Sequence, residues 1–269
     1  MKRILARNLA MAAALAVLAA TAGTWPAAAA DTKPDPAAAA TAAAADLEPA
    51  ALGALDKMGA YLQTLSAIEV EAVTQREDVL ETGLKVQFQG TVKLVARKPD
   101  RLRIDVLSDR QDRQYFYDGK QFTLWARRVG YWAVAPAPPT IGELTVALQE
   151  KFGIEMPFVD LFRWGTPAAD KSAITLAMDI GPSKVGDDPC EHYVFRQEGL
   201  DWQIWIQNGN APLPRKLVLT TTTDEARPQF QAIYTWNTAP TINDADFTFV
   251  PPADAQRIVF ETGASNKEK

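Results

Sequence analysis

The stretch Asp201–Thr223, DWQIWIQNGNAPLPRKLVLTTTT, predicts two β-strands joined by a turn. Apolar residues of the first strand alternate with polar ones, which is the pattern of a half-buried strand. Asn208-Gly209-Asn210 marks the turn, and Leu217 and Leu219 resume the alternation. The stretch therefore predicts a sheet with one apolar face, and it contains no nucleophile, base or ligand cluster.

The same alternation recurs along most of the chain, and short helical patterns interrupt it. We expect further strands near residues 68–72, 84–96, 102–106, 114–117, 121–125, 131–135, 174–180, 192–196 and 230–236. Helical spacing predicts helices over 48–65, from Thr140 to Phe152, and over 158–164.

This element order predicts a mainly β (α+β) fold. An antiparallel sheet with one apolar face usually buries that face against helices, and the helices expected here are short beside the strand surface. Because twisted sheets curl, we expect an incomplete antiparallel β-barrel, a half-barrel, with helices covering an apolar concave face.

The first 30 residues have the features of a secretory signal peptide, with three basic residues, an apolar run and a small-residue end. We expect residues 1–30 to be removed on export to the periplasm. No cysteine lies near the cleavage site, so we expect a soluble product that is neither lipidated nor membrane-spanning. Residues 31–49 read as a disordered Ala/Pro-rich spacer, residues 50–262 as the half-barrel domain, and 263–269 as a disordered tail.

The charge and cysteine content narrow the classes of function. The formal net charge is −5, and loss of the three basic residues of the signal peptide takes it to −8, so we expect no nucleic-acid binding. Cys190 is the only cysteine. No intramolecular disulfide can form, and stability must come from packing.

Four segments carry a resemblance to a known family: RKPDRLRIDV (residues 97–106), YDGKQFTLW (117–125), CEHYVFR (190–196) and DWQIWIQNGNAPLPRKLVLT (201–220). With the signal peptide, the chain resembles the predicted periplasmic family called domain of unknown function 2092, within the LolA/LolB-like lipoprotein-carrier superfamily. The resemblance implies a half-barrel whose helices plug an apolar concave face, in the periplasm. The family has no established activity, and this chain lacks the lipidation cysteine of membrane-anchored relatives.

We expect the ligand cavity to be lined by apolar residues of one strand face. They are Val86, Phe88, Val92, Leu94, Leu102, Ile104, Trp202, Ile204, Ile206, Leu217, Leu219, Tyr234 and Trp236. Arg215 and Lys216 are candidates for a cationic rim, although solvated strand ends explain them equally well.

The sequence offers few candidate residues for a catalytic or metal site. Cys190 and His192 are two residues apart, but a structural zinc site needs four ligands and the chain has one Cys and one His. We interpret them as a buried thiol and a hydrogen-bonded strand histidine. We expect no catalytic residues, no metal and no cofactor, and therefore no enzyme.

The leading hypothesis is a monomeric periplasmic carrier or chaperone that shields an acyl chain, a lipid or a lipidated protein in the half-barrel cavity. The alternative is an envelope protein-interaction or sensor module that binds a protein partner and no lipid.

Overall fold

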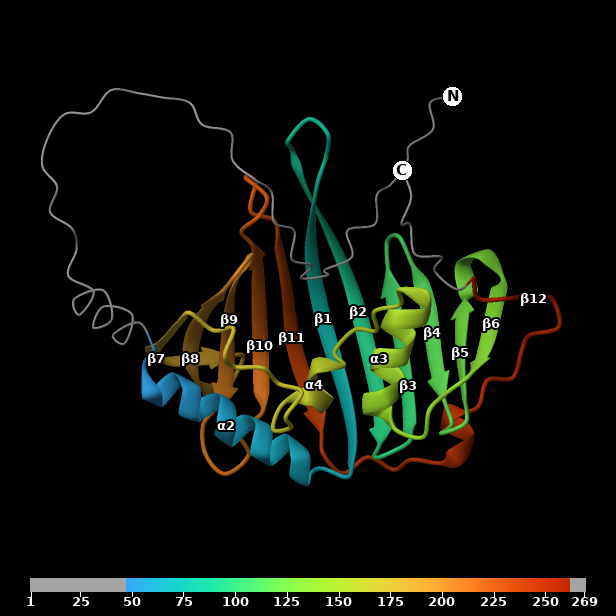
Figure 1. Ribbon diagram of the computed structural model, residues 1–269, viewed down its shortest axis with the longest axis horizontal. Coiled ribbons are helices and arrows are strands. Elements are labelled where there is room, and N and C mark those ends of the chain that lie inside the picture. Colours follow the sequence, from blue (N-terminus) through green and yellow to red (C-terminus); the bar gives the residue numbers. More distant parts are fainter. Residues whose placement is uncertain (1–46, 262–269) are drawn as a thin grey trace, which may run out of the picture. The chain divides into compact units, whose positions relative to one another are not determined.

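One open sheet of twelve strands dominates the computed structural model, which describes residues 47–261 (Figure 1). The strands are β1 (Ala67–Val79), β2 (Lys85–Arg97), β3 (Arg101–Ser108), β4 (Asp112–Tyr117), β5 (Gln121–Ala126), β6 (Tyr131–Pro136), β7 (Leu176–Val185), β8 (Asp188–Gln197), β9 (Leu200–Gln207), β10 (Pro214–Thr221), β11 (Gln229–Asn237) and β12 (Gln256–Ile258). Their order across the sheet is β12-β6-β5-β4-β3-β2-β1-β11-β10-β9-β8-β7. The two end strands do not meet, so the barrel is incomplete as predicted.

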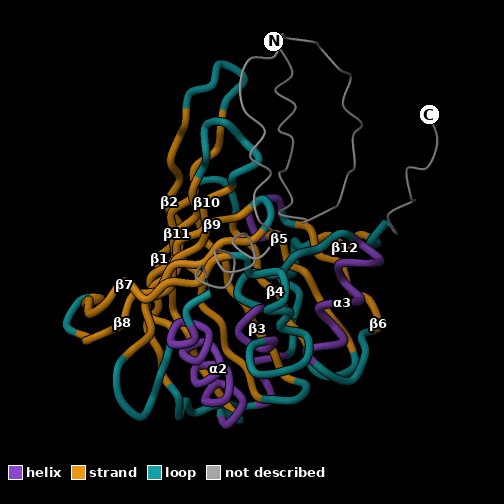
Figure 2. The backbone as a smooth tube through the Cα atoms, turned by 60° about the vertical axis from the view of Figure 1, so that its left-hand side comes forward, coloured by secondary structure: helices purple, strands orange, loops and turns teal. Residues whose placement is uncertain are grey.

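Helices cover one face of this sheet, which we call the inner face (Figure 2). They are α2 (Pro49–Thr64), α3 (Ile141–Phe152) and the short α4 (Asp160–Arg163). Two 3-10 turns, η1 (Arg127–Val129) between β5 and β6 and η2 (Asp244–Phe247) between β11 and β12, complete the helical elements of the described residues. The described part of the chain is therefore mainly β, with few helices, and the predicted half-barrel fold is confirmed.

The core divides into two clusters under different helices. In the first, side chains of β1–β5 and β11 pack against Ile141, Leu144 and Leu148 of α3. In the second, side chains of β7–β9 pack against Leu55 and Met58 of α2. Two helices thus share the inner face, each covering one half of the sheet.

Local sequence explains where these helices begin and how one of them docks. Thr140 caps α3, because its hydroxyl oxygen accepts a hydrogen bond from the Glu143 N–H at 3.2 Å. Pro49 starts α2 at a position that needs no N–H donor. Gly59 lets the chain cross α2 closely, since a Cβ there would lie 2.5 Å from the backbone nitrogen of Gly165.

The C-terminal segment lies along the β6 edge of the sheet, and the sequence did not predict it. β12 pairs with β6 in parallel, whereas every other strand pair in the described chain is antiparallel. Phe249 packs against Phe116, Trp125 and Trp132 on the outer face. Phe260 packs on the inner face. The segment therefore covers both faces of this edge.

The predicted signal peptide, spacer and tail lie at the two ends of the chain, mostly beyond the residues that the structure describes. The predicted signal peptide, residues 1–30, the tail 263–269 and most of the spacer lie outside the described residues. Inside the stretch predicted as a spacer to residue 49, Leu47 forms an isolated bridge with Ala177 and Pro49 begins α2. The folded segment thus includes the last residues assigned to the spacer.

Candidate ligand pocket on the concave face

The residues predicted to line a cavity all lie on the inner face, but most of them are buried under helices. Five are buried in the cluster beneath α3, namely Val92, Leu94, Leu102, Ile104 and Tyr234. Three more, Trp202, Ile204 and Ile206, are buried beneath α2. Val86, Phe88, Leu217, Leu219 and Trp236 are half-buried. Their role as ligand contacts stays a prediction, and none of them lines the two pockets described here.

The two residues predicted as a cationic rim are engaged in separate contacts. Arg215 lies in a bulge of β10 and forms an ion pair with Asp188. Lys216 lies over the ring of Trp205, 4.6 Å from the ring centroid. Neither borders the two pockets, and their action as a rim stays a prediction.

An apolar pocket of about 380 Å³ opens at the β6 end of the inner face. Its lining is Leu124, Ala126, Val129, Tyr131, Ala133, Phe152, Ile154, Ile258, Val259, Phe260 and Glu261. Only Tyr131 and Glu261 carry polar side-chain atoms, so the walls can exclude water from an apolar ligand while two polar groups remain to orient it.

Residues of β5, β6, the end of α3 and the C-terminal segment build this pocket. Leu124 on β5 and Ala133 on β6 are paired across the two strands and point to the inner face. The end of α3 supplies Phe152, and Gly153 takes a left-handed conformation, with φ 62°, that turns the chain towards Ile154. Phe260 completes the wall, with its ring centroid 4.9 Å from that of Phe152.

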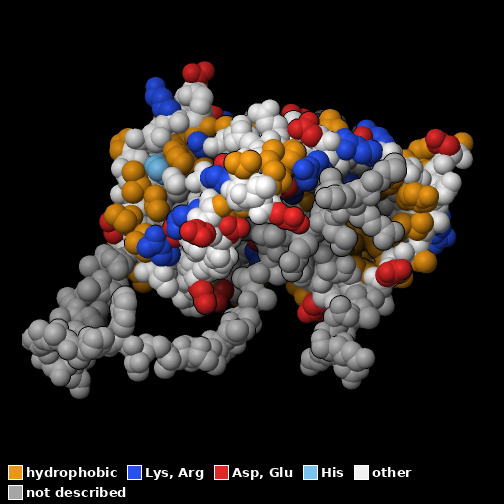
Figure 3. Space-filling view, turned by 90° about the horizontal axis from the view of Figure 1, so that it is seen from above, with side chains coloured by type: hydrophobic (Ala, Val, Ile, Leu, Met, Phe, Trp, Pro, Cys, Tyr) orange, Lys and Arg blue, Asp and Glu red, His pale blue; other side chains and the backbone are white. Residues whose placement is uncertain are grey.

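Large apolar side chains around the pocket are exposed to solvent. Val129, Tyr131, Ile258 and Val259 keep 61%, 40%, 49% and 82% of their accessible surface. Figure 3 shows hydrophobic side chains at the surface of the end that carries β6 and β12. Exposed apolar side chains next to an apolar pocket are typical of a binding site.

Part of this pocket could be predicted from the sequence. Strands near 121–125 and 131–135 and the helix to Phe152 were predicted, so Leu124, Tyr131, Ala133 and Phe152 could be placed on the right elements. Residues 256–261 show no alternation of their own, and only their pairing with β6, more than a hundred residues earlier, places Phe260 in the pocket. The pocket was therefore missed, although Phe260 is the one aromatic residue in that segment.

The Cys190 and His192 side chains behave as the sequence interpretation expected. The thiol is fully buried, and burial raises the pKa of Cys190. His192 stacks on Trp205, with ring centroids 3.9 Å apart, and its Nε2 lies 3.0 Å from the Gln203 side-chain oxygen. Within residues 47–261, no group of three or more His, Cys, Asp or Glu side chains is placed to hold a metal ion.

Fold and pocket together define the class of this protein, an open antiparallel half-barrel with helices on its concave face and an apolar pocket at one end. The chain belongs to the DUF2092 family, described as a predicted periplasmic protein, whose model matches residues 51–261. No helix among the described residues has the length and hydropathy needed to cross a bilayer. No curated protein matches the sequence.

Several solved structures are similar to the chain at low sequence identity. An uncharacterized conserved protein from Thermus thermophilus matches with 11% identity and a TM-score of 0.46, over 78% of this chain and 99% of that one. Lipoprotein LppX from Mycobacterium tuberculosis matches with 9% identity and a TM-score of 0.43, over 73% and 100%. A LolA superfamily protein from Nitrosomonas europaea matches with 8% identity and a TM-score of 0.33, over 74% and 97%.

Proposed function

We propose that this protein is a periplasmic carrier or chaperone that binds an apolar ligand, such as an acyl chain, in the pocket between β5, β6, the end of α3 and the C-terminal segment. The observation that carries the proposal is the pocket itself, whose walls are apolar except for Tyr131 and Glu261. Its volume of about 380 Å³ falls within the range of roughly 300–1,000 Å³ typical of small-molecule sites. The role is one of binding, and we propose no catalytic step.

The contacts of Phe260 support a pocket that admits a ligand without unfolding the core. Its ring packs against Phe122 and Phe152, with centroid separations of 6.0 and 4.9 Å, at the border of the larger core cluster. A bound chain would extend this aromatic wall outward, towards Val129 and Val259, whose side chains are exposed to solvent. Burying such surface stabilises a complex by about 25 cal/mol per Å² of apolar area.

Native mass spectrometry of the protein purified from the periplasm tests the proposal. We expect a mass increase that corresponds to a co-purified lipid or fatty acid and disappears after delipidation. A mass equal to that of the polypeptide, together with a specific protein captured by cross-linking, would instead support the envelope interaction module.

One feature of the outer face favours that second candidate. Ile233, Val73, Thr91 and Leu107 lie side by side across β11, β1, β2 and β3. Val73 and Leu107 keep 53% and 56% of their accessible surface. A row of exposed side chains with three apolar members on the outer face of the sheet is suited to contact with a protein partner. Replacement of Val73 and Leu107 by Ser should abolish cross-linking to such a partner and leave lipid binding unchanged.

A further inference from the structure

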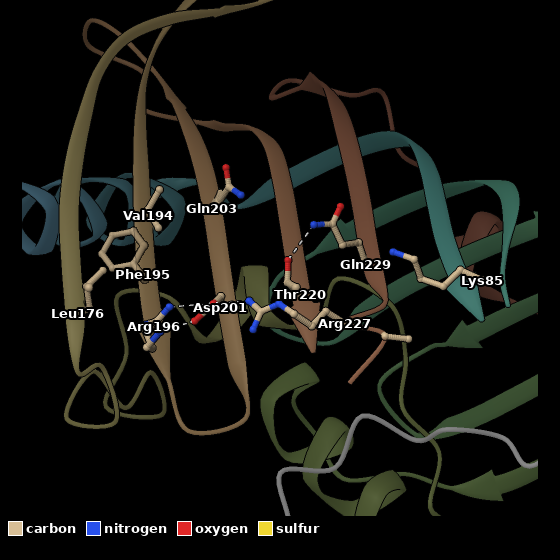
Figure 4. Close-up of a pocket in the computed structure, with 11 residues that line it drawn as sticks. Lys85, Leu176, Val194, Phe195, Arg196, Asp201, Gln203, Thr220, Arg227 and Gln229 are labelled. Atoms are coloured by element: carbon tan, nitrogen blue, oxygen red, sulfur yellow. Dashed lines mark hydrogen bonds and ion pairs between the residues drawn. The ribbon is translucent and has the colours of Figure 1, made fainter. Parts of the chain in front are cut away.

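A second pocket, of about 400 Å³, opens on the outer face, away from the helices that cover the inner one (Figure 4). Its polar lining comes from β8, β9, β10, β11, the loop before β11 and the start of β2, namely Arg196, Asp201, Gln203, Thr220, Arg227, Gln229 and Lys85. The proposed carrier function does not use this pocket.

The charge of this pocket is opposite to that of the whole chain. Three cationic side chains, Lys85, Arg196 and Arg227, line it together with one carboxylate, Asp201. The chain as a whole carries a formal charge of −5. A local excess of positive charge in a hollow of an acidic protein attracts an anion.

Asp201 fixes the two guanidinium groups in place without using all their donors. Arg196 donates to the two Asp201 oxygens at 2.6 and 3.1 Å, and Arg227 donates to one of them at 2.8 Å. A guanidinium has five N–H donors, so both arginines keep donors for a ligand. One carboxylate between two guanidiniums leaves a net positive charge at this point.

The backbone conformation of Arg227 helps to hold this arrangement. Its φ is 48°, a left-handed conformation that residues with a side chain rarely adopt. Asp224 holds the turn, since it accepts hydrogen bonds from the N–H groups of Ala226 and Arg227. The loop thereby directs Arg227 across β10 towards Asp201 on β9, as Figure 4 shows.

Neutral donors lie next to this ionic group, with Thr220 opposite Asp201 on β10 and Gln203 two residues further along β9. The Gln203 side-chain oxygen is engaged with His192, which leaves the Gln203 amide N–H groups for a ligand. Thr220 accepts a hydrogen bond from the Gln229 side chain at 3.1 Å, so its own O–H remains a donor. The pocket combines cationic and neutral donors, which a group with several acceptor oxygens can satisfy at once.

We propose that this outer-face pocket binds a phosphate group, contacted by Arg227 and the free donors of Arg196, Gln203 and Thr220, with Lys85 at the other end of the pocket adding positive charge without direct contact. The phosphate can come from a small soluble molecule or from a lipid headgroup. Lys85 pairs with Glu77 at 3.1 Å, so its ammonium is shared with this carboxylate and adds only a longer-range attraction for the phosphate. The ligand class is thus different from the apolar ligand of the inner face.

Calorimetric titration of the full chain with inorganic phosphate, and flotation with phosphatidylcholine vesicles with and without phosphatidic acid, test this proposal. We expect saturable binding of free phosphate, or selective flotation with phosphatidic acid if the headgroup is the source. Arg227→Gln should weaken binding tenfold or more, because it removes a charged donor and leaves the Arg196–Asp201 pair intact. Lys85→Gln should weaken it less, since the ammonium is shared.

Lys57→Gln is the matched control, because it removes one positive charge from an exposed position of α2. It should leave binding unchanged. The proposal is overturned if neither inorganic phosphate nor phosphatidic acid vesicles bind the wild type. It is equally overturned if Arg227→Gln and Lys85→Gln weaken binding no more than Lys57→Gln does.

Discussion

Phe260 packs against Phe152 with ring centroids 4.9 Å apart, which joins the last described residues to the end of α3. This contact closes one wall of the apolar pocket. Phe260→Ala should therefore lower the free energy of unfolding by about 1–2 kcal/mol, since a half-buried ring and its aromatic contacts are lost. Urea denaturation measures the change.

The neighbouring Val259 provides a control for this prediction. Its side chain is 82% exposed, so Val259→Ala should change the free energy of unfolding by less than about 0.5 kcal/mol. Equal losses in the two variants would mean that the segment is not held by the Phe260 contact.

Most of the residues predicted to line a cavity are covered by helices, so replacing them with smaller residues should destabilise the fold as it does for core residues. Ile204 is buried against the cluster beneath α2, so Ile204→Ala should cost about 2–5 kcal/mol. Phe88 is half-buried, with Arg110 3.9 Å from its ring centroid, and Phe88→Ala should cost only about 1 kcal/mol. Similar small losses for both would indicate an open cavity beneath α2.

Much of this arrangement follows from local sequence. Alternation in residues 84–96 and 201–207 placed β2 and β9 and assigned their apolar faces correctly, because strand periodicity is a local property. Thr140 and Glu143 likewise marked the start of α3. The parallel pairing of Gln256 with Tyr131 is non-local, and nothing in either segment alone encodes it.

The difference between local and non-local information also explains why the position of the pocket could not be predicted. An apolar strand face does not reveal which part a helix will cover, because that depends on loop lengths and on close contacts such as Gly59 with Gly165. Ile104 and Leu124 both belong to alternating strands, yet α3 buries Ile104 completely while Leu124 lines the pocket. The sequence therefore predicts an apolar concave face but not the position of the opening in it.

His192 should titrate below its ordinary pKa. Burial lowers the pKa of His192 from its usual value near 6.5, and Lys216 acts in the same direction, while the Gln203 contact opposes them. It is the only histidine, so its ring protons can be followed directly by NMR. A pKa at or above 6.5 would contradict the packing of the ring on Trp205.

The lowered pKa of His192 also determines how the stability of the protein should change with pH. Because the folded pKa lies below the unfolded one, the contribution of neutral His192 is fully present above about pH 6.5 and is lost as the pH falls below it. His192→Gln should remove this dependence between about pH 5 and 7. Denaturation curves of both proteins across that range provide the measurement.

The contribution of Asp201 to stability should also be lost on acidification, but here the favoured deprotonated form is the charged one. Hydrogen bonds from Arg196, and then from Arg227, lower the pKa of the Asp201 carboxyl below 3.8. Its contribution is therefore present above the unfolded pKa and lost as the pH falls through the folded one. Asp201→Asn should cost about 1–3 kcal/mol at pH 7, and the difference from the wild type should shrink towards pH 3.

Asp187, an exposed residue near the start of β8, is the control for removal of a negative charge. Asp187→Asn should leave the free energy of unfolding within about 0.5 kcal/mol of the wild type. A loss as large as that of Asp201→Asn would show that net charge, and not the arginine contacts, accounts for the effect.

Calorimetric titration with dodecanoate of the wild type, Ala133→Trp and Thr91→Trp tests most directly whether the inner-face pocket binds an apolar chain. Ala133 lines the pocket, so an indole there should fill it, whereas Thr91 is exposed on the outer face. We predict saturable binding to the wild type and to Thr91→Trp, and binding at least tenfold weaker to Ala133→Trp, with all three proteins folded. No binding to the wild type, or equal binding to all three, would contradict the proposed function.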